Sequence, residues 1–354
     1  MKPVYINSVA SISAQRTFDN SVFLDEITEH TDNVIRVIDP NYKEFIPPAA
    51  ARRMAKGIKM GVAASKIALQ EAGLENVDAI ITGTGLGCIA DSEKFVSKII
   101  DDNEEYLTPT SFIQSTHNTV AGQIALSIKC KGYNFTYVHS SVSFESALLD
   151  AKLQLEYDEA QNILVGGVDE LADHHIKIHK LVDHIKADVV NSKELLESNT
   201  EGAVFGEGAS FFVLSNEKSD HTYAQVLDVA TYNSLSKQES QNALESFLQE
   251  NSLEISDIDI VAMGNNGDIG YDGYYDALSH GVFKNTAQTY YKHLCGEFNT
   301  ASSFGAWMAA KMIRTQHIPE AIQLNGMEPS KIGTVLLYNQ YRGENHSFVL
   351  LRGC

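Results

Sequence analysis

The stretch KGYNFTYVHSSVSFESALLDAKLQLEYDEAQNILVGGVDE, from Lys131 to Glu170, decides the fold of this chain. An apolar run from Tyr133 to Val138 leads through a short polar turn into a segment whose apolar residues recur at helical spacing. A second apolar run then ends in two glycines. This pattern predicts a strand, a sharp turn, a buried helix and a second strand. We expect Ser141, at the turn, to project into a pocket beside the helix amino terminus, where enzymes commonly place a nucleophile.

Length and hydropathy set the size of the core. With 354 residues, 44% of them hydrophobic, the chain can form one large α/β unit or two similar halves. No window approaches the roughly 20 apolar residues of a membrane span. The amino-terminal segment MKPVYINSVASIS is too short and too polar for a secretory signal. We therefore expect a cytoplasmic protein.

The charge balance is strongly acidic, with 27 Lys and Arg against 46 Asp and Glu, a net charge of −19. Such a surface disfavours nucleic acid and anionic membranes. It also disfavours an acidic carrier protein unless a basic patch or a partner subunit receives it. The one basic patch consists of Arg52, Arg53, Lys56 and Lys59, which we interpret first as the solvated face of an amphipathic helix.

Alternating strand and helix patterns continue along the chain. Helical spacing covers residues 50–72 and 302–316, and strand-like runs are found at 77–82, 205–214, 259–263, 335–338 and 347–351. The alternation occurs twice, which favours a layered α/β architecture with helices between sheets. We place a first half at residues 1–216, with a cap segment at about 171–200, and a second half at 222–354.

No motif predicts a cofactor. Gly83, Gly85 and Gly87 follow a strand, but Cys88 stands where a dinucleotide fingerprint needs its third glycine. The four cysteines lack CxxC or Cys/His ligand spacing. His175 and His179 are spaced to bind a metal from one helix face, yet no carboxylate stands at ligand spacing, so a solvated helix is the preferred interpretation. We expect neither a metal nor a nucleotide.

Several motifs together resemble the thiolase-fold β-ketoacyl synthases of fatty acid and polyketide assembly. They are KG(x)18A from Lys131 to Ala151, VGGVDE from Val165, EGAVFGEGASFFVL from Glu201, TPTSFIQSTHNTVAGQIAL, and KHLCGE from Lys292. The resemblance implies a thiolase-like αβαβα sandwich of two pseudo-repeated halves. The segments RRMAKGIKM, SFIQSTHN and LCGEFNTASSF further resemble synthase-like subunits of bacterial aryl polyene and flexirubin pathways.

The chain departs from this family at every position that the resemblance marks as catalytic. Ser141 replaces the cysteine nucleophile, and Met263, in MGNNGDIGYD, falls on the first histidine of the motif HGTxTxxGD. Glu297 falls on the second histidine, whereas Lys292 is retained. A serine hydroxyl without a base is a poor nucleophile, and an ionised Glu297 would oppose an enolate instead of stabilising it. We therefore expect no residue able to catalyse condensation.

The gate loop of the family, GFGGTN, also differs. Residues 340–345 read QYRGEN, so Tyr341, Arg342 and Gly343 stand where a flexible glycine-rich gate would be.

A synthase-like subunit without condensing residues resembles the chain-length factors of type II polyketide systems. The resemblance implies a heterodimer with a catalytic ketosynthase, an acyl carrier protein received through that partner, and a homodimer in its absence. The candidates for the tunnel wall or subunit interface are Thr110, Ser111, Phe112, Ile113 and His139, of which Thr110 to Ile113 could equally provide ordinary interface packing.

Two alternatives stay open at this point. Ser141 could serve an acyl hydrolase or acyltransferase with Glu297 or His139 as its base. Against this, Lys292 is expected to form a buried ion pair with Glu297 or another carboxylate. The chain could also be an inactive homodimeric scaffold.

Overall fold

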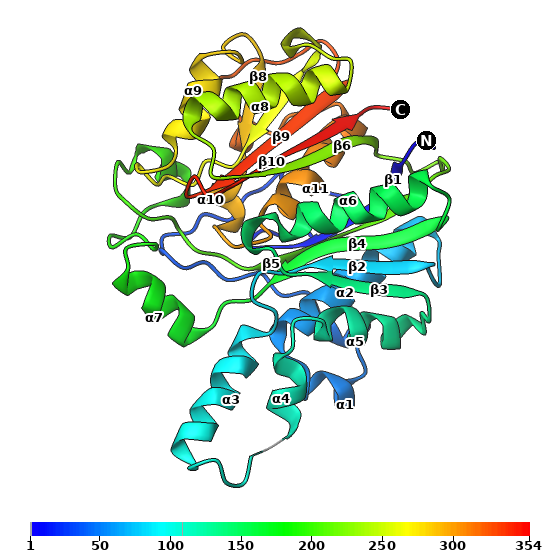
Figure 1. Ribbon diagram of the computed structural model, residues 1–354, viewed down its shortest axis with the longest axis vertical. Helices are drawn as coiled ribbons and strands as arrows, with labels where there is room; N and C mark the ends of the chain where they lie inside the picture. Colours follow the sequence, from blue (N-terminus) through cyan, green and yellow to red (C-terminus); the bar gives the residue numbers. More distant parts are fainter. Residues whose placement is uncertain (1, 108) are drawn as a thin grey trace.

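The computed structural model describes residues 2–107 and 109–354 (Figure 1). Thr108, the first residue of the motif TPTSFIQSTHNTVAGQIAL, lies outside the described residues. The strands are β1 (Tyr5–Ile12), β2 (Ala79–Gly83), β3 (Tyr133–Tyr137), β4 (Asn162–Asp169), β5 (Gly208–Ser215), β6 (Ala224–Asn233), β7 (Ile260–Met263), β8 (Ala287–Tyr290), β9 (Thr334–Tyr341) and β10 (Asn345–Arg352).

The helices connect and cover these strands. They are α1 (Pro48–Ala51), α2 (Lys56–Ala72), α3 (Ile89–Asp101), α4 (Pro109–Ser115), α5 (Thr119–Ile128), α6 (Ser143–Glu156), α7 (Asp173–Leu181), α8 (Lys237–Glu250), α9 (Gly273–His280), α10 (Lys292–Cys295) and α11 (Ser302–Thr315). Short 3-10 helices are η1 (Tyr42–Glu44), η2 (Ser140–Val142), η3 (Ser192–Glu197), η4 (Ile255–Asp257) and η5 (Glu320–Ile322). No helix of the described chain is both long enough and apolar enough to cross a membrane.

The sheet topology repeats itself. Its strand order is β3-β2-β4-β5-β1-β6-β10-β9-β7-β8. Read outward from the centre, the first half has the order β1, β5, β4, β2, β3, and the second half has the order β6, β10, β9, β7, β8. The two orders are identical when β6 to β10 are renumbered as strands 1 to 5. β1 and β6 join the two sets through a short antiparallel pairing, Tyr5 with Gln225 and Ile6 with Ala224. The predicted thiolase-like fold of two pseudo-repeated halves is therefore confirmed.

Helices form layers around and between the two sets of strands. α6 packs on β2, β4 and β6, and α11 packs on β5, β9 and β1, so both lie in the centre of the molecule (Figure 1). One apolar cluster joins Phe144 of α6 and Trp307 of α11 with strands of both halves. Separate clusters lie under α2 and under α8 with α9. This gives the helix-sheet-helix-sheet-helix arrangement that the resemblance implies.

The predicted helix over residues 50–72 is interrupted. Residues 52–55 separate α1 from α2, because Ala55 adopts an extended backbone (φ −56°, ψ 159°) and its N–H is bonded to the side chain of Gln114 at 2.7 Å. Gly73 ends α2 with a positive φ of 67°, as the sequence predicts.

The segment around Pro109 also differs from expectation. α4 starts at Pro109 and packs against α3, and neither helix is among the predicted helical segments. Figure 1 shows these two helices projecting from the body of the molecule. None of the α3 residues is buried, so the apolar side chains of this amphipathic helix do not face the core.

Candidate functional site

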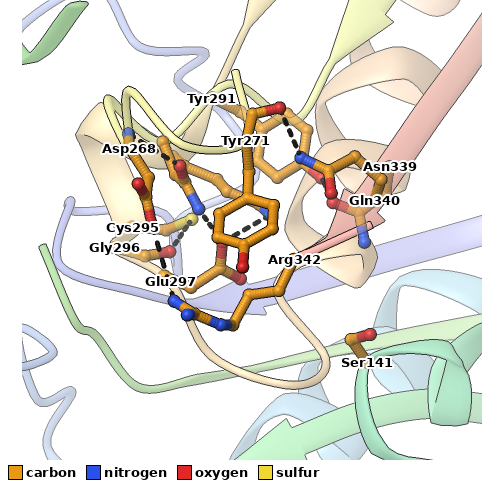
Figure 2. Close-up of polar contacts among 12 residues, drawn as sticks. Ser141, Asp268, Tyr271, Tyr291, Cys295, Gly296, Glu297, Asn339, Gln340 and Arg342 are labelled. Carbon is orange, nitrogen blue, oxygen red and sulfur yellow. Dashed lines mark hydrogen bonds and ion pairs between the residues drawn. The ribbon is translucent and has the colours of Figure 1, made fainter. Parts of the chain in front are cut away.

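Ser141 lies in η2, between β3 and α6, and is only 1% exposed. Its hydroxyl donates a hydrogen bond of 3.1 Å to the amide oxygen of Asn345, the first residue of β10. Ser141 is therefore held by the second half of the chain. Figure 2 shows it lying apart from Glu297 and Arg342.

His139 does not provide the missing base. It is exposed, and its Nδ1 bonds the Ser146 hydroxyl at 3.1 Å. The bonds of Ser141 and His139 thus lead to different partners, and no imidazole is hydrogen-bonded to the Ser141 hydroxyl. A serine without a base is a weak nucleophile.

The predicted Lys292–Glu297 ion pair is confirmed. The Lys292 ammonium lies 2.7 Å from Glu297 Oε2, and the two side chains are 1% and 3% exposed. Asn266 donates a second bond of 2.6 Å to the same carboxylate oxygen. These contacts neutralise the carboxylate and occupy an acceptor that a general base needs free.

Backbone contacts fix Glu297 in place. Gly296 precedes it with a positive φ of 75°, and a Cβ there would lie 2.6 Å from the Gly206 Cα. Only glycine permits this close approach. The Glu297 N–H donates to Val204 O at 2.7 Å, and its carbonyl accepts from Gly206 N at 2.9 Å. The carboxylate therefore sits on a rigid junction between the two halves.

The assignment of Met263 to the first histidine position stays a prediction, and the loop that Asp272 anchors offers the adjacent Gly264 as an alternative. Met263 is 1% exposed and belongs to the apolar cluster under α8 and α9. Asp272 accepts hydrogen bonds from Asn266 N and Gly267 N, as a loop-anchoring aspartate would. Counted back from Asp272 as the last residue of HGTxTxxGD, the histidine falls on Gly264. Successive strand residues face opposite ways, and a Cβ at Gly264 would meet Asn339, Tyr275 and Tyr291.

Neighbouring side chains occupy the space into which a side chain at Gly264 would project. The Tyr291 hydroxyl donates to Asn339 Oδ1 at 3.3 Å (Figure 2). Burial raises the pKa of both Tyr275 and Tyr291 well above its ordinary value, so both phenols stay protonated. A larger side chain at Gly264 has no room beside them, and the first imidazole is absent by packing as well as by sequence.

The turn that replaces the glycine-rich gate is held by side-chain contacts. Arg342 and Gly343 adopt positive φ values of 51° and 67° between β9 and β10. The Arg342 guanidinium lies 3.6 Å from Asp268 and 4.6 Å from the ring centroid of Tyr271 (Figure 2). The Gly343 N–H donates to the Gln340 side chain at 2.9 Å. These bonds restrict the movement that a gate requires.

A cavity of about 340 Å³ lies beside this turn. Its walls combine apolar side chains with buried carboxylates and two imidazoles: Gly85, Leu86, Ser140, Asp169, Glu170, Leu171, His175, His179, Phe205, Gly206, Glu297, Phe298, Asn299 and Tyr341. Ser140 lines the cavity, whereas Ser141 does not. No lysine or arginine is among these residues, so the cavity offers no cation to a malonyl carboxylate.

Two carboxylates of this wall lie at the end of β4, where Asp169 is the last residue of the strand and Glu170 follows it. Asp169 accepts bonds from the Thr84 hydroxyl and the N–H groups of Gly85 and Leu86, and from both the N–H and hydroxyl of Thr300. Glu170 accepts bonds from Gly57 N at 2.5 Å and Ala90 N at 3.0 Å. Burial nevertheless raises the pKa of Glu170 to about 7.

We interpreted His175 and His179 of α7 as part of a solvated helix face, and the structure corrects this. His175 and His179 are partly buried and line the cavity, with ring centroids 4.1 Å apart. Nδ1 of His179 lies 2.9 Å from Nδ1 of His184. Burial lowers the pKa of His179 to about 4, so the ring is neutral at pH 7. Among residues 2–107 and 109–354, no group of three or more His, Cys, Asp or Glu is arranged to hold a metal ion.

The family model described as β-ketoacyl synthase, N-terminal domain, matches residues 8–220, which is more than half of the chain. The chain belongs to the β-ketoacyl synthase family. No curated protein matches its sequence.

Solved structures share the synthase fold at low sequence identity. The ishigamide ketosynthase/chain length factor is 17% identical with a TM-score of 0.83, and the similarity covers 100% of this chain and 99% of that one. A β-ketoacyl synthase from Burkholderia phymatum STM815 is 15% identical with a TM-score of 0.81, covering 100% of both chains. A ketosynthase in complex with its chain length factor from Xenorhabdus doucetiae is 15% identical with a TM-score of 0.78, covering 100% and 98%.

Four of the five predicted tunnel or interface residues, Thr110 to Ile113, lie on α4, whereas His139 precedes η2. Phe112 and Ile113 are 55% and 59% exposed, whereas Ser111 is buried. The Phe112 ring lies 5.3 Å from that of Phe95 on α3. The two bulky residues of this set are therefore presented to the outside of the protomer.

The residues of the predicted basic patch near the start of α2 have different surroundings. Lys56 lies 2.5 Å from the fully buried Glu207, while Arg52 and Arg53 are exposed. Lys56 is thus a structural ion-pair partner, and the solvated face comprises the two arginines.

Sequence reasoning missed two cavity-lining residues, Ser140 and Glu170. Ser140 precedes Ser141, and Glu170 is the last residue of the VGGVDE motif. A motif locates the turn or the strand end, but which of two neighbours faces a cavity depends on backbone angles that the sequence does not show.

Proposed function

We propose that this chain is a non-condensing, chain-length-factor-like subunit that pairs with a catalytic β-ketoacyl-ACP synthase and shapes the acyl tunnel. The observation that carries the proposal is the buried Lys292–Glu297 ion pair. Condensation requires neutral imidazoles that stabilise an enolate oxygen. The family motifs assign the two imidazole positions to Glu297, which is paired, and to Met263, so on this proposal the chain depends on another subunit for the chemistry.

The edge of the sheet supports a protein partner. β3 is the edge strand of the sheet in the first half. One side of an edge strand carries backbone N–H and C=O groups that no neighbouring strand pairs. Its Tyr133 and Phe135 rings are each 45% exposed and stack with centroids 6.0 Å apart. A strand edge bearing exposed aromatic rings is suited to pairing with another chain.

The α3–α4 hairpin adds an apolar surface. Five large apolar side chains on it are at least half exposed: Val96, Ile100, Tyr106, Phe112 and Ile113. Apolar groups clustered in this way mark interaction sites. Phe112 at the end of the partner's tunnel would set the length of the acyl chain that the tunnel accepts.

A catalytic ketosynthase is the partner that best fits these surfaces. A second copy would produce a dimer with no condensing residues at either site. We propose that an acyl carrier protein is received through the partner, since the chain carries a net charge of −19. The motifs RRMAKGIKM and LCGEFNTASSF favour an aryl polyene or flexirubin type of product.

Co-expression with a catalytic ketosynthase tests the proposal. We expect a mixed dimer by size exclusion, and ketoacyl product from malonyl and acyl thioesters only when the ketosynthase is present. Phe135→Glu places a charge at the strand edge and should abolish pairing. Met327→Glu, at a residue of the second half that is 42% exposed, is the matched control and should pair normally.

Three outcomes would contradict the proposal. Condensation by this chain alone would assign it the missing chemistry. A stable homodimer that excludes every ketosynthase would favour the inactive scaffold. Acyl transfer that requires Ser141 would favour the hydrolase or acyltransferase.

A further inference from the structure

We propose that a cavity at the carboxyl ends of α11 and β10 binds a small phosphate-bearing molecule through Arg314, Lys331 and Arg352. The cavity has a volume of about 410 Å³ and shares no lining residue with the cavity beside α7. Figure 1 shows the carboxyl end of β10 on the opposite side of the view from α7. This site is additional to pairing with a ketosynthase and does not depend on it.

Three segments bring the cations of this cavity together. Arg314 lies in the last turn of α11, Lys331 precedes β9, and Arg352 ends β10. Arg352 is paired across the sheet with Thr334, the first residue of β9. The register of these two antiparallel strands therefore places Arg352 beside the segment that carries Lys331.

The three cations lack counter-ions. No aspartate or glutamate of the described chain lines the cavity. Within residues 2–107 and 109–354, neither arginine takes part in an ion pair, and nor does Lys331. Acidic residues outnumber basic ones by 46 to 27 in this chain, so a wall whose charged side chains are all positive departs from the composition of the protein. Like charges repel, and an anion bound among them removes this repulsion.

Arg314 is already held in position for a ligand. Its guanidinium donates to the main-chain oxygen of Thr222 at 3.2 Å and to that of Asp220 at 3.1 Å. These carbonyl groups are neutral, so they orient the guanidinium and leave its positive charge uncompensated. A guanidinium has five N–H donors in a geometry that matches phosphate oxygens, so further donors remain for a bound anion.

The carbonyl groups at the end of α11 are bonded within the protein. A helix carboxyl terminus ordinarily presents unpaired carbonyl oxygens, which disfavour an anion. Here the oxygen of Lys311 accepts a bond from the Thr315 hydroxyl at 2.8 Å. The oxygens of Met312 and Ile313 accept from the main-chain N–H and the side-chain amide of Gln316, at 2.9 and 2.7 Å. These bonds reduce the repulsion that the helix end would otherwise exert.

Phosphate is the anion that best fits these groups. Two guanidinium groups can each bind phosphate oxygens with two parallel hydrogen bonds, and a lysine adds a point charge. The cavity volume lies within the range of about 300–1,000 Å³ that is typical of small-molecule sites. The buried side chains of Ile313 and Ile332 complete the wall, so an organic part of the ligand has apolar surface to contact.

Calorimetric titration of the full-length chain with pyrophosphate at low ionic strength tests the proposal. We expect saturable binding of one pyrophosphate per chain. Lys331→Gln and Arg352→Gln should each weaken the affinity about tenfold, because each removes a charge-assisted hydrogen bond. Arg53→Gln is the matched control, since it removes the same charge from an exposed residue outside the cavity and should leave the affinity unchanged. Lys331 is itself exposed, so its variant should keep the circular dichroism spectrum of the wild type.

The outcomes separate this inference from the proposed function. Absence of saturable binding would overturn the inference. Equal weakening in Arg53→Gln and Arg352→Gln would also overturn it, because it would show general attraction to surface charge. Pairing with a ketosynthase is measured by size exclusion on the same preparations, and Lys331→Gln should pair normally. Loss of pyrophosphate binding alone therefore leaves the proposed function standing, and loss of pairing alone leaves the phosphate site.

Discussion

The ammonium group of Lys292 lies 2.7 Å from the carboxylate of Glu297, with both side chains buried at a junction of the two halves. Lys292 begins α10, and Glu297 follows the tight turn at Gly296. The resemblance to the family motifs places Glu297 at the second histidine position, and the ion pair buries that carboxylate with a counter-ion.

Removing one member of this pair should destabilise the protein strongly. Glu297→Gln leaves the Lys292 charge buried without a counter-ion, which typically costs about 3–5 kcal/mol. The double variant Lys292→Met with Glu297→Gln removes both charges and should recover much of that loss. Urea unfolding of the two single variants and the double variant measures the coupling. Strict additivity of the two single effects would show that the charges do not interact.

Glu170 should make stability depend on pH. Burial raises its pKa from 4.5 to about 7, so the folded state binds the proton more tightly than the unfolded chain. The contribution of the protonated carboxyl is complete below pH 4.5 and is lost as the pH rises through 7. At about 1.4 kcal/mol per pKa unit, the loss approaches roughly 3 kcal/mol.

The variant Glu170→Gln isolates this effect, since it cannot titrate. The free energy of unfolding is measured in urea at pH 4.5 and again above pH 7. Because the wild type loses stability over this range, the variant should be more stable relative to the wild type above pH 7 than at pH 4.5. An equal difference between variant and wild type at both pH values would rule out the titration of Glu170.

Arg342 should restrain the turn between β9 and β10. Arg342→Ala removes the contacts with Asp268 and Tyr271, so amide hydrogen exchange at residues 341–345 should accelerate. Lys237→Ala is a matched control, because Lys237 lies 5.9 Å from the ring centroid of Tyr274, a neighbour of the same turn. Unchanged exchange in Arg342→Ala would mean that the backbone alone holds the turn.

Phe112 should set product length in the mixed dimer. Phe112→Ala removes the bulky side chain on α4 that we place at the end of the tunnel, so the products should become longer. Mass spectrometry of the acyl products measures this. Ile100→Ala, on the neighbouring helix α3 and 70% exposed, is the control for general damage to the hairpin. The same product length in wild type and Phe112→Ala would remove Phe112 from the tunnel.

The sequence predicted the parts of the site that depend on local pattern. The strand, turn and helix around Ser141 follow from the spacing of apolar residues, and the Lys292–Glu297 pair follows from two opposite charges in one buried motif. It did not predict α3, whose residues face outward, nor the break before α2, where Ala55 bonds a glutamine from α4. Those features depend on contacts between segments distant in the chain.

By itself, the sequence determined the family, the repeated architecture and the absence of the cysteine and histidines, because residue identity and hydrophobic period are sufficient for these. Only the tertiary structure decided that Met263 is buried in the apolar cluster under α8 and α9, and that Ser140, and not Ser141, lines the cavity. Adjacent residues point in different directions, and backbone angles and packing decide which one faces the cavity.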